Sequence, residues 1–193
     1  QDELLAKVLA LYQGHVDFTR QHFAALWHDQ LTLNTAGSPS YQAHAQETLS
    51  NEVAIGTGLL KPSHYDLPSL AAHVPAVYIA TPVLKRTGAL RIPALDEKSQ
   101  LLSWWDVNRR ETLFIYGGNW QADLLSPAGL QLSGLYGRSS NQELLNGSPA
   151  VGLEVDDQVF LRPTQSESVL LQFGDLLAVR DGRIVERWPV YTS

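Results

Sequence analysis

The first part of the chain repeats apolar residues at the spacing of a helix. From Asp2 to about His28 they recur every three or four positions, which predicts a helix with one apolar face. Asp2 can cap its start, and Gly14 is expected to interrupt it, so that a second helical piece follows. The apolar face is formed by Leu4, Leu5, Val8, Leu9, Leu11 and Tyr12 in the first piece, and by Phe18, Phe23, Leu26 and Trp27 in the second.

A strand that breaks into a turn of small residues comes next. Residues 31–35 alternate apolar and polar side chains, which predicts a buried strand, and the turn begins at Ala36. Because Gly37 has no Cβ, the main chain there can turn sharply and bring its N–H groups close to a ligand, while Ser38 and Ser40 add hydroxyl donors. Such a group at the carboxyl end of a strand is typical of a phosphate cradle. The alternative is an ordinary Gly-Ser-Pro turn between a strand and a helix.

The composition of the sequence changes after residue 60, because proline, glycine and short runs of β-forming residues dominate there. Before this change, 41–49 is predicted to form a short helix or turn, and 52–60 a strand or exit segment. After it, the pattern predicts strands at 76–84, 112–116, 131–135, 150–155, 158–161 and 170–173. A final hairpin joins 176–180 to 183–188 through Asp181-Gly182, a dipeptide typical of a two-residue turn. A helical start followed by a run of strands indicates two units in an α+β arrangement, with a boundary after residue 58.

The composition of the chain excludes some classes of function but does not indicate a specific one. The chain has 193 residues, 44% of them apolar, and a formal net charge of −6. This charge, without a basic cluster, argues against a nucleic-acid partner, and no apolar run is long enough to predict a membrane span. Cysteine is absent, which fits a cytoplasmic protein. Methionine is absent even at position 1, so we expect the chain to be a piece of a longer protein or a processed product.

Several blocks of residues resemble, in their order and spacing, the C-terminal part of a known enzyme group. The blocks are Thr35–Tyr41, Asn51–Gly58, Phe114–Gly118, Tyr136–Glu143, Val159–Asp175 and Arg180–Val190. Together they resemble the D-serine dehydratase and D-threonine aldolase group, pyridoxal-phosphate enzymes of the alanine-racemase-like fold. The resemblance implies the terminal αβ elements of a (β/α)8 barrel in residues 1–58, followed by a mostly antiparallel β domain in residues 59–193.

The resemblance also implies a cofactor site without its lysine. The loop after the late barrel strand corresponds to the family's phosphate loop, so Thr35, Gly37, Ser38 and Tyr41 are the expected pyridoxal-phosphate contacts. The lysine that carries the cofactor lies near the start of the family's barrel, upstream of this chain. None of Lys7, Lys61, Lys85 and Lys98 has such a context, and we assign no catalytic residue here.

The chain departs from the zinc-dependent members of the group. Those members carry a His-x-Cys pair before the final hairpin, whereas residues 162–168 contain neither histidine nor cysteine, and the block ending at Glu143 lacks the family's histidine. Zinc requires several nitrogen, sulfur or carboxylate donors, so we predict no metal site. Instead Gln165, Ser166 and Glu167 are candidates to line the substrate side, the alternative being a solvated turn. Asn141 and Gln142 are weaker candidates for the same role.

By resemblance, the function is removal of the Cα proton from a D-amino acid held as an imine of pyridoxal phosphate, in an enzyme of the D-serine dehydratase, deaminase or racemase type. The expected partners are a small D-amino acid, the upstream barrel segment and a second subunit in a homodimer. That upstream part could also be a separate chain after cleavage. The alternative from another class is a non-catalytic β-rich binding or interaction module, since no complete catalytic set is visible in the sequence.

Overall fold

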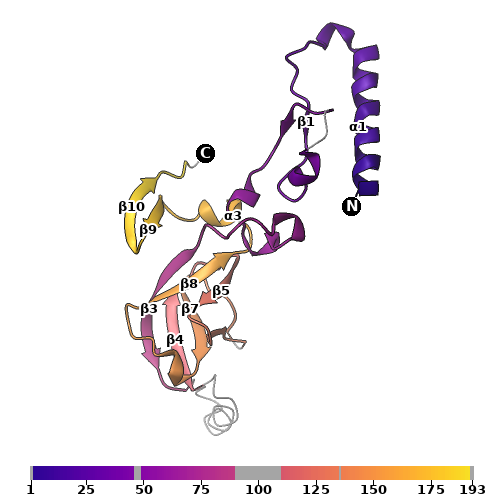
Figure 1. Ribbon diagram of the computed structural model, residues 1–193. Coiled ribbons are helices and arrows are strands. Elements are labelled where there is room, and N and C mark those ends of the chain that lie inside the picture. The colour runs from indigo at the N-terminus through magenta and orange to yellow at the C-terminus, as the bar shows by residue number, and fades with distance from the viewer. Residues whose placement is uncertain (1, 46–48, 90–109, 135, 192–193) are drawn as a thin grey trace. The chain divides into compact units, whose positions relative to one another are not determined.

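A computed structural model describes residues 2–45, 49–89, 110–134 and 136–191 (Figure 1). The chain divides into two compact units. The first comprises Gln1–Leu59 and Tyr65–Val74, and the second Leu60–His64 and Pro75–Ser193. The assignment of these units to a barrel and a β domain stays a prediction.

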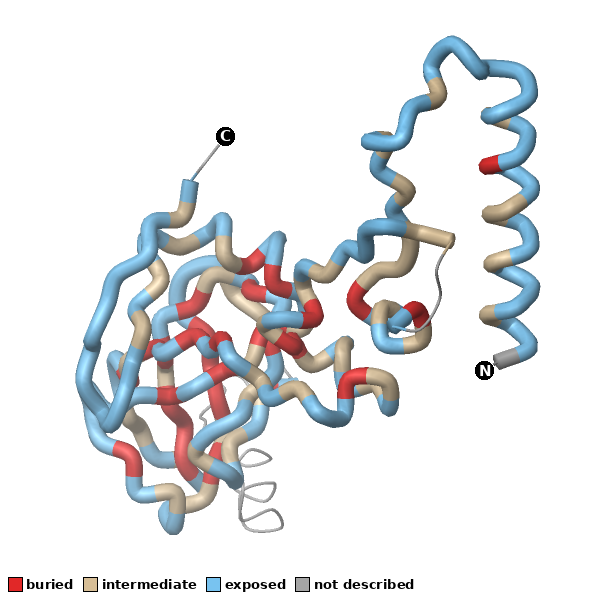
Figure 2. Tube along the Cα trace, turned by 45° about the horizontal axis from the view of Figure 1, so that its top comes forward, coloured by how far each residue is buried: buried red, intermediate tan, exposed pale blue. Residues whose placement is uncertain are grey.

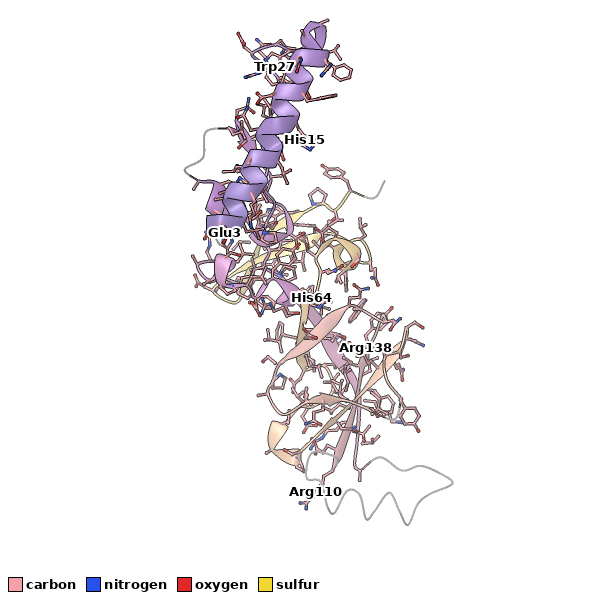
Figure 3. The ribbon with its side chains drawn as sticks, turned by 90° about the vertical axis from the view of Figure 1, so that its right-hand side faces the viewer. Glu3, His15, Trp27, His64, Arg110 and Arg138 are labelled. Carbon is pink, nitrogen blue, oxygen red and sulfur yellow. The ribbon has the colours of Figure 1, made fainter. Side chains whose placement is uncertain are left out.

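The first unit begins with one long helix, α1, from Asp2 to His22. The prediction that Gly14 interrupts it was wrong. A glycine inside a helix costs only about 0.5–1 kcal/mol relative to alanine, which one side-chain pair before Gly14 and one that spans it help to offset. Lys7 contacts Glu3 at 2.7 Å, and the Gln13 amide donates to Asp17 at 2.8 Å. In Figure 3, Glu3 and His15 lie along α1, and Trp27 lies beside its last turn, where Arg20 is 4.4 Å from the Trp27 ring. No helix in the described residues has the length and apolar character needed to cross a bilayer.

The remainder of the first unit consists of short elements. The predicted strand at 31–35 is only two residues long, and the expected strand or exit segment at 52–60 splits into a short strand and a 3-10 turn. The elements are η1 Ala24–Leu26, β1 Asn34–Thr35, η2 Tyr41–His44, β2 Glu52–Val53, η3 Thr57–Leu59 and η5 Pro68–Leu70, with η4 Ser63–Tyr65 at the boundary between the units.

Strands β1 and β2 pair in parallel, with Asn34 opposite Glu52. The Asn51 side chain extends this pairing, because its Oδ1 accepts from the Leu33 N–H at 2.8 Å and its Nδ2 donates to the Leu31 carbonyl at 3.0 Å. Tyr12 on α1 donates its hydroxyl to the Asn34 carbonyl at 3.1 Å, which ties the helix to β1. The loops that follow the two strands therefore leave from the same edge of the pair.

The second unit is built on a six-stranded antiparallel sheet of strand order β5-β8-β3-β4-β7-β6 (Figure 1). Its strands are β3 Ile79–Thr87, β4 Glu111–Tyr116, β5 Ala122–Ser126, β6 Gln131–Leu132, β7 Gln142–Gly147 and β8 Gln158–Pro163. The mostly antiparallel β structure predicted for this region is confirmed. Sequence patterning missed β5 and β7, and the strand predicted at 150–155 was wrong, because residues 149–151 form the 3-10 turn η7.

The hydrophobic core of the second unit lies in the interior enclosed by this curled sheet. The core cluster takes residues from β3, β4, β5, β7 and β8, and Trp120, Leu153 and Val169 from the segments between and after these strands. Figure 2 shows the buried positions gathered along the strands of this unit. The largest of them are Leu113, Ile115, Leu145 and Leu161, none more than 1% exposed. Leu132 of the edge strand β6 packs against the same core as Ala122 of the opposite edge strand, so the sheet curls around one interior.

An ion pair with a buried carboxylate lies between the edge strand β5 and strand β7. Arg138, labelled in Figure 3, lies in the connection between β6 and β7. It contacts a Glu143 oxygen at 2.7 Å and also donates to the carbonyl of Ala122, the first residue of β5. The Glu143 side chain is 1% exposed, and its second oxygen has no hydrogen-bond partner among the described residues. Arg138 thus joins strands that share no ladder of hydrogen bonds.

The chain closes with the predicted hairpin, which is confirmed as β9 Leu176–Arg180 and β10 Arg183–Trp188. Asp181 and Gly182 both have positive φ, 50° and 72°, as a two-residue turn between twisted strands requires. The strand expected at 170–173 was wrong, because Glu167–Leu170 forms a short helix, α3, followed by a turn. The hairpin forms a separate two-stranded sheet and exposes Leu177, Val179, Ile184 and Trp188.

Candidate functional site

The candidate site in the first unit is a pair of loops that follow the parallel strands β1 and β2. Residues 36–41 leave β1, and residues 54–58 leave β2. The carboxyl ends of neighbouring parallel strands are where α/β proteins commonly hold ligands. The two loops are joined here by one side chain, that of Ser38.

Ser38 is 7% exposed, and its hydroxyl oxygen accepts two main-chain hydrogen bonds. The Gly58 N–H donates at 2.9 Å and the Gly56 N–H at 3.3 Å. A hydroxyl oxygen has two lone pairs and one proton, so both lone pairs are used and the proton remains to be donated. A Cβ on Gly58 would lie 2.8 Å from the Ser38 Cβ, so this approach requires glycine at position 58.

The loop at Gly37 turns for a different reason than the sequence predicted. The residue with left-handed backbone is Ala36, with φ of 65°, and Gly37 is not among the positive-φ glycines. The N–H groups of Ser40 and Tyr41 both donate to the Gly37 carbonyl, at 2.9 and 3.0 Å. These two N–H groups are therefore engaged within the turn, whereas the Ser38 hydroxyl proton is still available for donation.

The other two predicted cofactor contacts, Thr35 and Tyr41, are bound to residues of the same unit. Thr35 donates its hydroxyl to Ser50 at 2.9 Å. The Tyr41 hydroxyl lies 2.7 Å from Nε2 of His73 and accepts from the Gln42 amide at 3.1 Å. Thr35 and Tyr41 thus hold the two ends of the loop, while Ser38 holds its middle.

The residues present fit a phosphate group. The loop offers small side chains, a hydroxyl proton whose oxygen is fixed by two N–H donors, and a glycine position that a Cβ would fill. The N–H dipoles of Gly56 and Gly58 point at the hydroxyl oxygen and polarise its O–H bond, which strengthens it as a donor to an anion. An oxygen of a phosphate is the acceptor that suits this donor.

The predicted substrate-side residues all belong to the second unit. Gln165 and Glu167 are exposed beside the start of α3, whereas Ser166, directly before the helix, is only 2% exposed and makes no side-chain capping hydrogen bond. Asn141 and Gln142 are exposed where β7 begins, and the Asn141 carbonyl accepts from the Gly117 N–H at 2.6 Å.

The fold brings these two groups to one end of the sheet. Strand β8 ends just before Gln165, and β7 begins at Gln142, with β3 and β4 between them. Each step across this sheet is antiparallel, so the carboxyl end of β8 and the amino end of β7 lie at the same end. Sequence spacing alone did not show this relationship.

The other reactive side chains are the possible metal ligands and the lysines. The described part of the chain holds no group of three or more histidine and acidic side chains that could bind a metal ion. Lys7 pairs with Glu3 on the exposed side of α1, and Lys85 lies 5.7 Å from the Phe114 ring. Lys61 is 8% exposed with φ of 45°, and its carbonyl accepts from Arg162 at 2.8 Å. Lys98 lies outside the described residues.

Sequence reasoning missed three residues of the loop pair: Gly56, Gly58 and His73. Two glycines directly after a second strand were a usable signal, because parallel pairing places consecutive carboxyl-end loops side by side. His73 gave no such signal, since its contact with Tyr41 spans 32 residues.

Comparisons with known proteins bear on the fold. No protein-family model matches the chain, and no curated protein matches it. Among solved structures, the chain is similar to D-threonine aldolase from Filomicrobium marinum, at 17% sequence identity and a TM-score of 0.60. The match covers 90% of this chain and 45% of that chain, so the chain spans less than half the length of the solved protein. At this identity the likeness establishes that the two chains share a fold over the matched region.

Proposed function

We propose that the chain is the C-terminal part of a pyridoxal-phosphate enzyme that acts on D-amino acids, of the D-serine dehydratase, deaminase or racemase type. The observation that carries this proposal is the buried Ser38 hydroxyl, fixed by the N–H groups of Gly56 and Gly58. The shared fold with a D-threonine aldolase and the sequence blocks that resemble this enzyme group both support it.

In this proposal the loop pair holds the phosphate of the cofactor. Ser38 donates its hydroxyl to a phosphate oxygen, while Thr35 and Tyr41 keep the loop in place through Ser50 and His73. Bound pyridoxal phosphate supplies an electron sink for the electron pair left when the Cα proton is removed. The site's own contribution is to fix the position and orientation of the bound group.

The second unit contributes the substrate side in this proposal. Gln165 and Glu167 offer an amide and a carboxylate at one end of the sheet, and Asn141 and Gln142 offer two more amides at the same end. Amide N–H groups suit a substrate carboxylate, and a carboxylate suits a substrate ammonium group.

The proposal includes an upstream barrel segment and a homodimer. Its support is the apolar stripe of α1, formed by Leu4, Val8, Leu11 and Phe18, which are between 46% and 69% exposed. Successive positions of the stripe are three or four residues apart, with His15 occupying the place between Leu11 and Phe18, so they lie along one side of the helix. A stripe of this kind is expected to be covered by another element in the working protein.

The test is binding of pyridoxamine 5′-phosphate, which carries the same phosphate but forms no imine with surface lysines. We expect calorimetry to show binding to the chain, and no binding of pyridoxamine without the phosphate. Ser38→Ala should weaken the affinity about tenfold or more, since it removes a hydrogen bond to a charged group. Ser40→Ala is the matched control, because Ser40 is exposed in the same turn. Binding that does not depend on the phosphate or on Ser38 would contradict the proposal.

A non-catalytic β-rich interaction module is the alternative function. One observation favours it: the hairpin of β9 and β10 leaves Ile184, Val185 and Trp188 more than half exposed. Apolar strands of this kind can receive a further strand from a partner. Absence of phosphate-dependent binding in the experiment above would make this the better interpretation.

A further inference from the structure

A histidine outside the predicted loop contacts one of its tyrosines. Nε2 of His73 lies 2.7 Å from the Tyr41 hydroxyl, and the two rings meet edge to face, with centroids 5.8 Å apart and planes at 82°. Both side chains are half-buried. The short distance and the ring geometry together indicate one defined arrangement of the pair.

The main chain fixes where His73 lies. Pro68 begins the η5 turn, and Leu70 at its end is fully buried, which fixes the position of the turn. The His73 N–H then donates to the Leu70 carbonyl at 3.0 Å. The imidazole is therefore presented from a short, internally bonded segment.

Tyr41 is the last residue of the loop that carries Ser38. Its N–H donates to the Gly37 carbonyl at 3.0 Å, so the position of Tyr41 is coupled to the turn directly before Ser38. The Gln42 amide donates to the Tyr41 hydroxyl at 3.1 Å, and the same hydroxyl shares a hydrogen bond with Nε2 of His73, whose direction depends on the imidazole tautomer. The loop is thus held at its far end by His73, and at its middle by Gly56 and Gly58.

We propose that His73 is a positioning residue of this anion site, acting through the Tyr41 hydroxyl to hold residues 36–41 in the conformation that aims Ser38 at a phosphate. The inference rests on the proposed function, because it assigns His73 to the same phosphate site. Without His73, the hydrogen bond from the Gln42 amide is what remains at the Tyr41 hydroxyl within the described part of the chain, and the loop loses this tie to residues 65–74. The loop then samples more conformations, and binding must restrict them again at a cost in affinity.

The test measures the affinity of the full 193-residue chain for pyridoxamine 5′-phosphate in four forms. They are the unsubstituted chain, His73→Phe, Tyr41→Phe and the double variant. We expect each single substitution to weaken binding about fivefold, the scale of one hydrogen bond between uncharged groups. The double variant should be no weaker than either single variant, because both remove the same contact. His73→Gln should bind within about twofold of the unsubstituted chain, because a glutamine amide reaches the position of Nε2 and can accept from the hydroxyl.

The possible outcomes separate this inference from the proposed function. No phosphate-dependent binding by the unsubstituted chain would overturn both. Normal binding by His73→Phe would overturn the positioning role alone, and so would effects that multiply in the double variant. Recovery in His73→Gln distinguishes positioning through the hydroxyl from simple packing, because packing would be lost in both variants. A urea unfolding curve for each variant confirms that the affinities refer to folded chains.

Discussion

The hydroxyl oxygen of Ser38 accepts a hydrogen bond from the Gly58 N–H at 2.9 Å, across 20 residues of sequence. This contact joins the loops that follow two parallel strands. It depends on glycine at position 58, because a Cβ there would lie 2.8 Å from the Ser38 Cβ and 3.1 Å from its hydroxyl oxygen.

Gly58→Ala should therefore push the two loops apart. We expect a loss of about 1–3 kcal/mol in unfolding free energy, the usual cost of added volume in a packed site, and a parallel loss of affinity for pyridoxamine 5′-phosphate. Gly56→Ala is the matched control, because a Cβ on Gly56 would meet nothing within 4 Å. Both are measured by urea unfolding and calorimetry. Equal behaviour of the two variants would show that the close approach at Gly58 is unimportant.

Arg138→Met should destabilise the second unit, because it leaves the buried Glu143 carboxylate without its cation. The Glu143 side chain is 1% exposed and that of Arg138 24%. Removing one partner of a buried pair costs about 3–5 kcal/mol, and the partial exposure of Arg138 lowers our expectation to about 2–4 kcal/mol. Replacing both residues, as Arg138→Met with Glu143→Leu, should restore part of the loss.

The control for this prediction is Arg187→Met in the same unit. Arg187 lies 3.6 Å from Asp175, with 71% and 37% of the two side chains exposed. An exposed pair of this kind contributes at most about 1 kcal/mol. Urea unfolding followed by tryptophan fluorescence measures both variants, and similar losses at the two arginines would contradict the role given to Arg138.

Gly14→Ala should stabilise α1. Gly14 lies inside the helix, and a Cβ there would meet nothing within 4 Å. Replacing a helical glycine by alanine in open space contributes about 0.5–1 kcal/mol, because the unfolded chain loses conformational freedom. The reverse change at an exposed position of the same helix, Ala10→Gly, should lower stability by a similar amount. Thermal melting followed by circular dichroism at a helix wavelength tests both, and a loss of stability in Gly14→Ala would contradict the prediction.

Arg86→Met should lower the urea midpoint of the second unit by the same amount at about pH 6 and about pH 9. Arg86 donates hydrogen bonds to Glu111 and Glu154. Both bonds, that to Glu111 more strongly, raise the pKa of the Arg86 guanidinium above its ordinary value. A base whose pKa is raised on folding contributes stability that is full below its unfolded pKa and is lost only as the pH rises through the folded pKa. Both pKa values of arginine lie above this pH window. A difference between the midpoint losses at the two pH values would contradict this account.

The sequence alone predicted those elements of the fold that depend on neighbouring residues. The apolar spacing of α1 and the Asp181-Gly182 turn were readable, because a helical face and a positive-φ turn depend on neighbouring residues. Strand β4 was found for the same reason, since Thr112 to Tyr116 is rich in β-branched and aromatic residues. Strands β5 and β7 were missed because Asp123 and Asn146 interrupt their apolar patterns, and pairing with β8 and β4 outweighs that propensity.

The sequence by itself identified the loop at Ser38 as a candidate phosphate site, from small residues and hydroxyls at a strand end. Only the tertiary structure decided which groups act there. The parallel pairing of β1 and β2 brings Gly56 and Gly58 to the Ser38 oxygen, and the turn after Pro68 brings His73 to Tyr41. These contacts span 18 to 32 residues, and no local propensity encodes them. They form because packing brings distant segments together, and a buried hydroxyl or N–H group must then find a partner.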